Sequence, residues 1–388
     1  MNGLALFLLY IGINCLFIAK YVSRIDCLLT VGGCMFYLIV MTAIACFANK
    51  GGLTVSRKRY GRIGVVLGKY YAIIVVCVFV LLIIGQACIN PYQINVDRWS
   101  AIHNFISELL EGRFPYKAET HLHGYGSPFP VWQILHIPFY LLGNVGLSFS
   151  VGTFLFLHSM YRLWGTRVSF IAFIPLIASP AYLYEIGVRS DLITNFLLSC
   201  AIANYLIYYK VRLDAHYIAL GILIGLLTST RFSAIIPLIM LYFHEFWLLN
   251  FKKKIVFVMT CLVVFSLTFL PFLIWDGEFL LQDGYSPFVL QTRQSRFSDL
   301  LIFIVIGIYF ALSWKGSYRK YYSYTAYLLC LTVAFTFSLN MMERHDWNEI
   351  FESTYDITYF DMCLVFVIAG MATSLKGYST NSNATSAG

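Results

Sequence analysis

Nine charged or polar side chains between the apolar stretches of this sequence have the types best suited to chemistry. They are Asp97, His121, His123, Tyr125, Arg189, Asp191, Arg231, Arg293 and Arg296. A carboxylate such as that of Asp97 can accept a proton from a hydroxyl group, and the planar guanidinium group of arginine binds anionic oxygens. Arg231 stands where two apolar stretches meet, and an ionisable group at that depth is costly unless it faces a cavity. Together these residue types could hold an anionic group beside a general base.

The composition indicates that lipid surrounds the elements that position these residues. Of the 388 residues, 59% are hydrophobic and 12% are charged, whereas about 25% of the residues of a soluble domain are charged. A soluble fold of this length could not cover so much apolar surface. We therefore expect an integral membrane protein without a soluble domain of appreciable size.

Apolar segments of about the length needed to cross a bilayer recur along the chain. Nine are clear, at 4–19, 27–48, 70–88, 168–182, 192–209, 233–249, 255–274, 322–339 and 357–371, and three are shorter or weaker, at 146–160, 217–228 and 300–313. No long alternation of polar and apolar residues indicates barrel strands, so the spans must be helices. The sequence predicts an all-α bundle of about twelve spans, with one polytopic domain at 1–375 and a short disordered cytoplasmic tail at 376–388.

Lysine and arginine collect in the loops that twelve alternating spans place on the side of the N-terminus. These basic segments are 50–69, 162–167, 210–212, 252–254 and 315–320. Basic loops stay in the cytoplasm, which predicts cytoplasmic N- and C-termini in a plasma (inner) membrane or its equivalent. The formal net charge of +8 then reflects membrane orientation, and no nucleic-acid partner is expected.

Three loops remain for the extracytoplasmic side, at 89–145, 184–191 and 275–298. In the first and largest, apolar residues recur every three or four positions from Trp99 to Leu110, which predicts a helix on the membrane surface with its apolar side down. The Gly/Pro/aromatic stretch 121–130 excludes a regular helix or strand, and the apolar segment 131–142 is interpreted as a second interfacial element. We expect the active site among these loops.

The ten cysteines do not indicate a metal site. All of them lie in or at the edges of apolar segments, without a CxxC pair and without Cys/His spacing typical of zinc. They are interpreted as small core residues. We predict no metal and no resident cofactor.

The order of the polar segments resembles that of the GT-C superfamily of membrane glycosyltransferases, which take a sugar from a polyprenyl-phosphate carrier on the outer or lumenal face. In that family a large first outer loop opens with an acidic residue, as Asp97 does here. Four further segments are similar to family elements: 112–116 (GRFPY), 125–130 (YGSPFP), the basic turn 161–167 (YRLWGTR) and 189–191 (RSD). The helix 221–231, which contains two glycines and ends in Arg231, is similar to another. The likeness covers 89–249 in detail and the rest as topology.

The sequence departs from the family pattern at two places. Arg98 follows Asp97, where many members carry a second acid, and Phe129 separates the two prolines that are adjacent in some branches.

The resemblance implies a hexosyltransferase, similar to mannosyltransferases, that builds a cell-envelope glycan. It would move a hexose from a polyprenyl-phosphate sugar to a hydroxyl group of a glycan, lipid or protein, with inversion at the anomeric carbon. Asp97 would take the hydroxyl proton, and Asp191 would orient the acceptor or hold an arginine. The sugar or phosphate would contact His121, His123 and Tyr125. The charge on the departing phosphate would be stabilised by Arg189, Arg231, Arg293 and Arg296.

Structural roles and other functions are the alternatives. Asp97 could be a helix N-cap only, Arg189 and Asp191 a structural pair, and Arg231 the partner of a buried carboxylate. The histidines could be ordinary loop residues, and Arg293 and Arg296 could meet lipid headgroups. One alternative function is that of a polysaccharide polymerase or ligase, but such proteins usually place their largest outer loop late in the chain, whereas here it comes early. The other is that of a transporter or lipid flippase. Such a protein should show internal repeats and broken, charged helices near the midplane, and this sequence shows no convincing repeat.

Overall fold

The computed structural model describes residues 2–50, 57–292, 296–314, 316–344 and 356–374. Within these ranges the chain is helical without a strand, apart from an isolated antiparallel bridge between Glu119 and Tyr125. The predicted all-α class is confirmed. Arg293 and the predicted tail at 376–388 lie outside the described residues.

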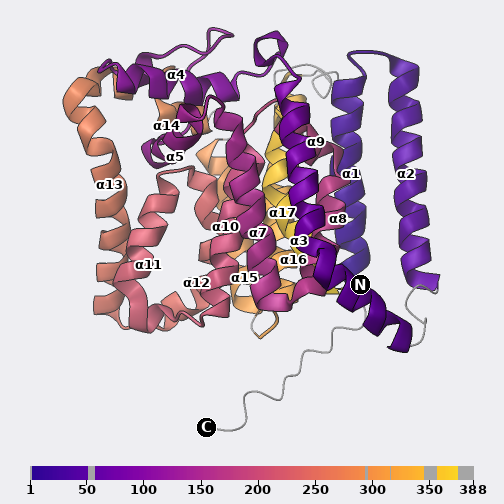
Figure 1. Cartoon of the computed structure of the whole chain (residues 1–388). Coiled ribbons are helices and arrows are strands. Elements are labelled where there is room, and N and C mark those ends of the chain that lie inside the picture. Colours follow the sequence, from indigo (N-terminus) through magenta and orange to yellow (C-terminus); the bar gives the residue numbers. More distant parts are fainter. Residues whose placement is uncertain (1, 51–56, 293–295, 315, 345–355, 375–388) are drawn as a thin grey trace.

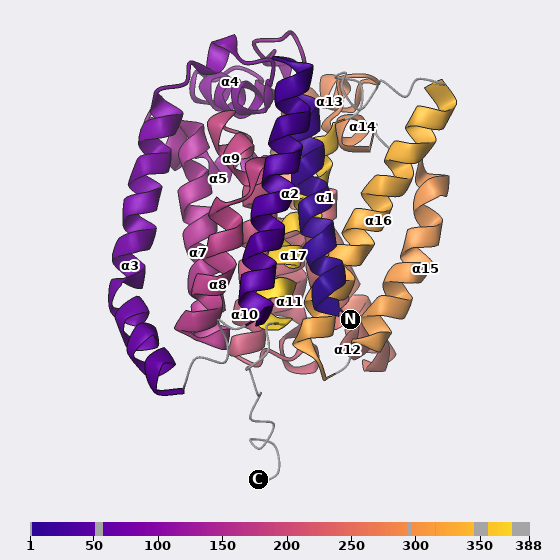
Figure 2. The same cartoon turned by 90° about the vertical axis from the view of Figure 1, so that its right-hand side faces the viewer.

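In the described ranges, the following helices form the body of the protein, and the long ones stand side by side (Figures 1 and 2). They are α1 (Asn2–Val22), α2 (Cys27–Lys50), α3 (Arg57–Ala87), α7 (Ser148–Trp164), α8 (Thr166–Ile177), α10 (Leu192–Tyr208), α11 (Leu213–Thr228), α12 (Ile236–Leu248), α13 (Phe251–Leu281), α15 (Phe297–Ser313), α16 (Tyr318–Arg344) and α17 (Asp361–Ser374). Shorter elements connect them: η1 (Pro91–Gln93), α4 (Arg98–Leu110), η2 (Pro115–Lys117), α5 (Pro130–Leu135), α6 (Ile137–Leu141), η3 (Val145–Leu147), α9 (Pro180–Gly187), η4 (Phe232–Ile235), α14 (Pro287–Thr292) and η6 (Ile357–Phe360).

Each of the twelve predicted apolar ranges coincides with a helix, and the range 168–182 coincides with two, α8 and α9. Six helices among the described residues have the length and composition to cross a membrane, and there are up to eight spans if each of two bent helix pairs is one span. The bent pairs are Pro130–Leu141 with Val145–Trp164 and Thr166–Ile177 with Pro180–Gly187. Four shorter apolar helices complete the set, Leu192–Tyr208, Leu213–Thr228, Phe232–Leu248 and Leu300–Ser313. Such helices are those of a multi-pass membrane protein.

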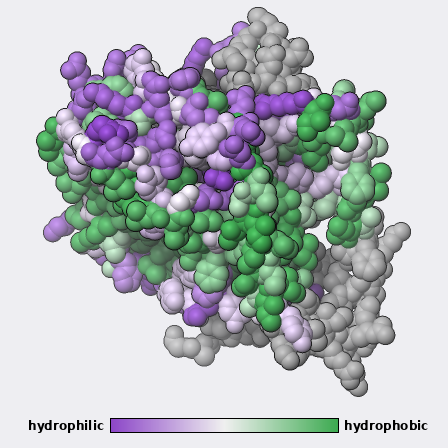
Figure 3. All heavy atoms as spheres, turned by 45° about the horizontal axis from the view of Figure 1, so that its top comes forward, coloured by the Kyte–Doolittle hydropathy of each residue, from purple (hydrophilic) through white to green (hydrophobic). Residues whose placement is uncertain are grey.

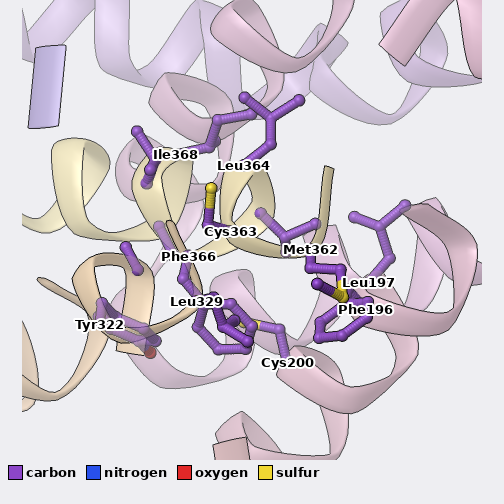
Figure 4. Close-up of a cluster of buried hydrophobic side chains, with 14 of the residues drawn as sticks. Phe196, Leu197, Cys200, Tyr322, Leu329, Met362, Cys363, Leu364, Phe366 and Ile368 are labelled. Atoms are coloured by element: carbon purple, nitrogen blue, oxygen red, sulfur yellow. The ribbon is translucent and has the colours of Figure 1, made fainter. Parts of the chain in front are cut away.

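The core of the bundle surrounds α17, which packs against α1, α8, α10 and α16. Figure 4 shows Cys363 and Phe366 of α17 among Phe196 and Cys200 of α10 and Leu329 of α16. Apolar side chains cover α17 on all sides because neighbouring helices enclose it. Because neighbouring helices enclose α17, its first residues have fixed positions at the end of the bundle.

Glycine lets α11 approach α13 closely. A Cβ atom at Gly225 would lie 2.8 Å from the backbone oxygen of Cys261, and one at Gly221 would lie 3.1 Å from that of Phe257. The two glycines are four residues apart and share one face of α11, an arrangement that brings transmembrane helices into backbone contact. This packing fixes the end of α11, where the chain continues into Arg231.

The described ends of the chain meet at one end of the bundle. A Cβ atom at Gly3, in the first turn of α1, would lie 3.7 Å from Cβ of Ser374, the last residue of α17. At the other end, α4 lies across the tops of the long helices and packs on α5 (Figure 1). Hydrophilic residues gather on that end, and hydrophobic residues follow below it (Figure 3).

The predicted helix after Asp97 is present as α4, but protein rather than lipid covers its apolar face. Trp99, Ile102, Phe105 and Ile106 are all at most 4% exposed. They pack in a second apolar cluster with side chains from the following loop, from α5 and from α13. The expectation that this face rests on the membrane is therefore wrong, because the loop and α13 supply the aromatic side chains that bury it.

Candidate functional site

Asp97 directly precedes α4, yet its side chain makes no capping hydrogen bond. Its Oδ2 atom accepts a hydrogen bond from the hydroxyl group of Thr120 at 2.8 Å. A Cβ atom at Gly124 would lie 2.9 Å from the same oxygen, so glycine allows the loop backbone to approach the carboxylate. The N-cap alternative is contradicted, and a half-buried carboxylate is left at the start of α4.

His121 lies against the first turn of α4. Its Nδ1 atom is 2.8 Å from the Ser100 hydroxyl group, and its Nε2 atom is 3.1 Å from the backbone oxygen of Ile94. The ring also lies beside that of Trp99, with 5.4 Å between centroids. Both ring nitrogens therefore have protein partners, and His121 fixes the loop near Asp97.

His123 and Tyr125 gather around Glu119. The His123 side chain is 89% exposed, and its Nδ1 atom lies 3.3 Å from Glu119 Oε2. The hydroxyl group of Tyr125 donates to Glu119 Oε1 at 3.3 Å, and its ring meets that of Tyr285 edge to face. These two predicted contact residues thus form a surface cluster that is joined to Asp97 only through the intervening loop.

Asp191 and Arg231 form a buried ion pair, as the structural alternative for Arg231 predicted. Arg231 Nη2 lies 2.8 Å from Asp191 Oδ2, and the indole nitrogen of Trp132 donates to the same oxygen at 2.6 Å. Burial alone would raise the pKa of Asp191, but the charge and hydrogen bond of Arg231, with the charge of Arg98, lower it below its usual range. The pair is therefore ionised and holds α10, α5 and the start of η4 together.

Hydrogen bonding around this pair is incomplete. Among the described residues, Asp191 Oδ1 and Arg231 Nε are buried without a hydrogen-bond partner, and so are both polar atoms of the Asn195 side chain, one turn into α10. The backbone nitrogens of Phe129 and Val131 bond the oxygens that precede Arg231, those of Thr230 at 3.3 Å and Ser229 at 3.1 Å. The Pro-rich segment thus enters the bundle beside the pair.

Arg189 does not pair with Asp191. Its Nη2 atom donates to the backbone oxygens of Gln86 at 3.4 Å and Ile89 at 3.3 Å. Its backbone has φ of 56°, a left-handed conformation that turns the side chain away from the direction an extended chain would give it. Burial lowers the pKa of Arg189 from its usual value. The predicted structural pair is therefore replaced by contacts with carbonyl groups.

Arg296 lies at the surface and pairs with a carboxylate. Its side chain is 71% exposed and lies 3.0 Å from Glu343 Oε1. Arg293 lies outside the described residues.

Arg98, which carries no assigned role in the sequence-based prediction, connects the Asp97 region to two other segments. Its guanidinium group donates to the Ser190 hydroxyl group at 3.1 Å, lies 3.7 Å from Glu185 Oε1, and bonds Asp356 and Thr358. Burial would lower the pKa of Arg98, but the charges of Asp356 and Glu185 raise it well above its usual value. The only sequence signal for Arg98 was that it stands where many GT-C members carry a second acid. Its pairing with Asp356 could not be predicted from the sequence, because the two residues are 258 positions apart.

The site as a whole combines the half-buried carboxylate of Asp97 with two sets of buried or half-buried ion pairs, Arg231 with Asp191 and Arg98 with Glu185 and Asp356. The Asp97–Arg98 and Arg189–Asp191 segments meet where Arg98 bonds Ser190. The described residues contain no group of three or more His, Cys, Asp or Glu side chains placed to hold a metal ion. The arrangement can accept a proton at Asp97 and can offer Arg189 to an anionic group.

Comparison with known proteins does not add a family, since no family model, curated protein or solved structure matches this chain.

Proposed function

We propose that this protein is a membrane glycosyltransferase that moves a hexose from a polyprenyl-phosphate carrier to an acceptor hydroxyl group, with inversion at the anomeric carbon. Asp97 takes the hydroxyl proton as the acceptor attacks. The observation that supports the proposal most directly is the hydrogen bonding of the Asp97 carboxylate. Asp97 directly precedes α4 without capping it, and the only described hydrogen bond of its side chain comes from Thr120. The GT-C-like order of segments supports the same assignment.

The departing phosphate needs a cation, and Arg189 is the best candidate among the predicted arginines. Arg231 and Arg296 are engaged by Asp191 and Glu343. In the described part of the chain, Arg189 contacts only carbonyl oxygens at 3.3 and 3.4 Å, and its Nε atom is buried without a partner. A phosphate oxygen would provide a stronger, charge-assisted bond than these long contacts. The neighbouring Ser190 contacts Arg98, which keeps Arg189 on the same side of the protein as Asp97.

The proposed topology has twelve crossings, with the basic end of the bundle in the cytoplasm and α4 outside. The six long helices, two bent pairs and four shorter apolar helices supply this number. Three basic groups meet at this end of the bundle: Arg162 contacts Tyr208 at the end of α10, and Arg212 and Lys253 contact Asp214 in the first turn of α11. A plasma (inner) membrane or its equivalent is the proposed location, with a lipid-linked sugar as donor and a glycan, lipid or protein as acceptor.

Sugar transfer by purified protein in lipid vesicles tests the activity. Radiolabelled polyprenyl phosphate mannose is the first donor, followed by the corresponding glucose and galactose compounds, with total membrane glycolipid as acceptor. We expect transfer by the wild-type protein and loss of transfer in Asp97→Asn at an unchanged melting temperature. Asp283→Asn is the matched control, because Asp283 is an exposed acid bonded to its own loop at Gly284. Movement of the lipid-linked sugar from one leaflet of the vesicle membrane to the other, without sugar transfer, would overturn the assignment as a glycosyltransferase in favour of a flippase.

Cysteine labelling tests the topology separately. In a background without native cysteines, Glu119→Cys should react with an impermeant maleimide in intact cells. Lys252→Cys should react only after permeabilisation. Reaction of both residues from the same side would exclude the proposed arrangement, because Glu119 belongs to the large loop and Lys252 to the basic turn between α12 and α13.

A further inference from the structure

We propose that Arg98 is a positioning residue for the proposed transfer reaction. Its guanidinium group holds the start of α4, and with it the Asp97 carboxylate, against the turn at 185–190 and the start of η6. This proposal rests on the proposed function, since it assigns the geometry of the same site.

The contacts of Arg98 join three distant segments. Nη1 donates to Ser190 at 3.1 Å and lies 3.7 Å from Glu185 Oε1, whereas Nη2 bonds Asp356 and Thr358. Asp356 Oδ1 also accepts from the backbone nitrogen of Thr358 at 3.0 Å, which fixes the carboxylate that receives Arg98. One side chain of α4 is therefore bonded to the α9–α10 turn and to the segment that enters the central helix α17.

Arg98 is not suited to bind the substrate itself. Its side chain is 17% exposed, and Glu185 and Asp356 neutralise its charge. Substrate phosphate would have to displace both carboxylates, which would leave them buried without a cation. The residue therefore acts through its neighbour Asp97.

The other attachments of α4 leave its position relative to the bundle less well defined. Ser100 and Asn104 bond His121 and the backbone oxygen of Glu119, but these partners belong to the loop that follows the same helix. Trp99, Ile102 and Phe105 hold the helix through apolar packing, and apolar packing is non-directional. The guanidinium group instead has a planar set of donors that requires defined partner positions. It thus sets the rotation of the first turn, and Asp97 moves with that turn because it is the preceding residue.

Loss of Arg98 removes the cation that lowers the pKa of Asp356 and opposes the rise that burial causes in the pKa of Glu185. Glu185 is 1% exposed, and Asp361, at the start of α17, is 0% exposed, with neither carboxylate oxygen bonded by any residue that the structure describes. Asp356 and these two acids interact electrostatically with Arg98. Without the guanidinium group, the bonds that join the start of α4 to Ser190, Asp356 and Thr358 are lost, and the start of α4 should move away from the turn at 185–190.

Two measurements on Arg98→Gln test the proposal. The first is transfer from radiolabelled polyprenyl phosphate mannose, or from the other hexose donor that the wild-type protein uses. Since a displacement of about 1 Å costs about 100-fold in rate, kcat should fall about 100-fold while KM for the donor changes less than about threefold. Arg98→Lys should recover part of the rate, and Asp356→Asn should resemble Arg98→Gln. The matched control is Arg24→Gln, because Arg24 is an exposed arginine that stacks on Tyr21.

The second measurement does not depend on sugar transfer. Val188, in the turn, is 5% exposed, and Val188→Cys should become reactive toward an impermeant maleimide when Arg98→Gln is added but not when Arg24→Gln is added. Wild-type kcat in Arg98→Gln, or a raised KM with unchanged kcat, would overturn the positioning role. If the wild-type protein transfers no hexose, the proposed function fails. If the reactivity of Val188→Cys is also unchanged in Arg98→Gln, Arg98 does not hold the start of α4 against the turn at 185–190.

Discussion

Asp191 and Arg231 form an ion pair in which Nη2 and Oδ2 are 2.8 Å apart, and 2% and 8% of the respective side chains are exposed. The pair lies between the start of α10 and the residue before η4, and Trp132 of α5 bonds the same carboxylate oxygen. Asp191 Oδ1 and Arg231 Nε have no hydrogen-bond partner in the part of the chain that the structure describes. Each charge therefore depends mainly on the other, because little else compensates its removal from water.

Breaking this pair should destabilise the fold strongly. Asp191→Asn or Arg231→Gln leaves one buried charge without its counter-ion, which costs about 3–5 kcal/mol. The double variant should recover part of this loss, because neither charge then remains. Thermal unfolding in detergent, followed by fluorescence-detected size exclusion, measures the difference. Asp214→Asn is the matched control, because the Arg212–Asp214 pair is exposed and such pairs contribute little.

The same pair predicts loss of stability in acid. The pKa of Asp191 is lowered in the folded protein: burial opposes the shift, but Arg231 outweighs it. In the unfolded chain an aspartate titrates near about 3.9, so the unfolded state binds the proton more readily. The stabilising contribution is complete above that value and is lost as the pH falls through the lower folded pKa. Between about pH 6 and about pH 3, a range that crosses the pKa of aspartate in the unfolded chain, melting temperatures of Asp191→Asn should fall less than those of the wild type. Parallel curves would contradict this.

The contact of α11 with α13 predicts that Gly225→Ala is destabilising. The added methyl group would lie 2.8 Å from the backbone oxygen of Cys261, and this backbone atom cannot rotate away as a flexible side chain could. The expected loss is about 1–3 kcal/mol, measured by thermal unfolding. Gly32→Ala in α2 is the control, because no atom lies within 4 Å of its added carbon. A Gly225→Ala variant as stable as Gly32→Ala would show that α11 moves freely relative to α13.

The helices could be predicted from the sequence, because a bilayer requires apolar segments of a characteristic length and composition. Periodicity also identified the buried face of α4, but it could not identify what covers that face. The aromatic side chains responsible, such as Phe272, come from α13 far along the chain. Periodicity reports burial and not the identity of the neighbouring surface.

Pairing of charges was less predictable than the helices. The segment 189–191 suggested a local pair of Arg189 and Asp191, but the left-handed backbone of Arg189 directs its side chain to carbonyl oxygens. Asp191 pairs instead with Arg231, 40 positions later. Arg98 and Asp356 are further apart still, and nothing local in either segment indicates the other. Such contacts depend on how the helices pack, which spacing along the chain does not reveal.

The two loop histidines should respond differently to substitution. His121→Ala removes contacts with the Ser100 hydroxyl group and the backbone oxygen of Ile94. Each lost hydrogen bond costs about 1 kcal/mol, and the loop that carries Thr120 should then hold the Asp97 carboxylate less firmly. His123→Ala is the matched control, because its side chain is 89% exposed and its only described polar partner is Glu119. We expect a lower melting temperature and slower sugar transfer in His121→Ala, with wild-type values in His123→Ala. Slower transfer in His123→Ala at an unchanged melting temperature would instead assign that surface histidine to substrate binding, because the only described polar contact that its removal loses is the one with Glu119 at the surface.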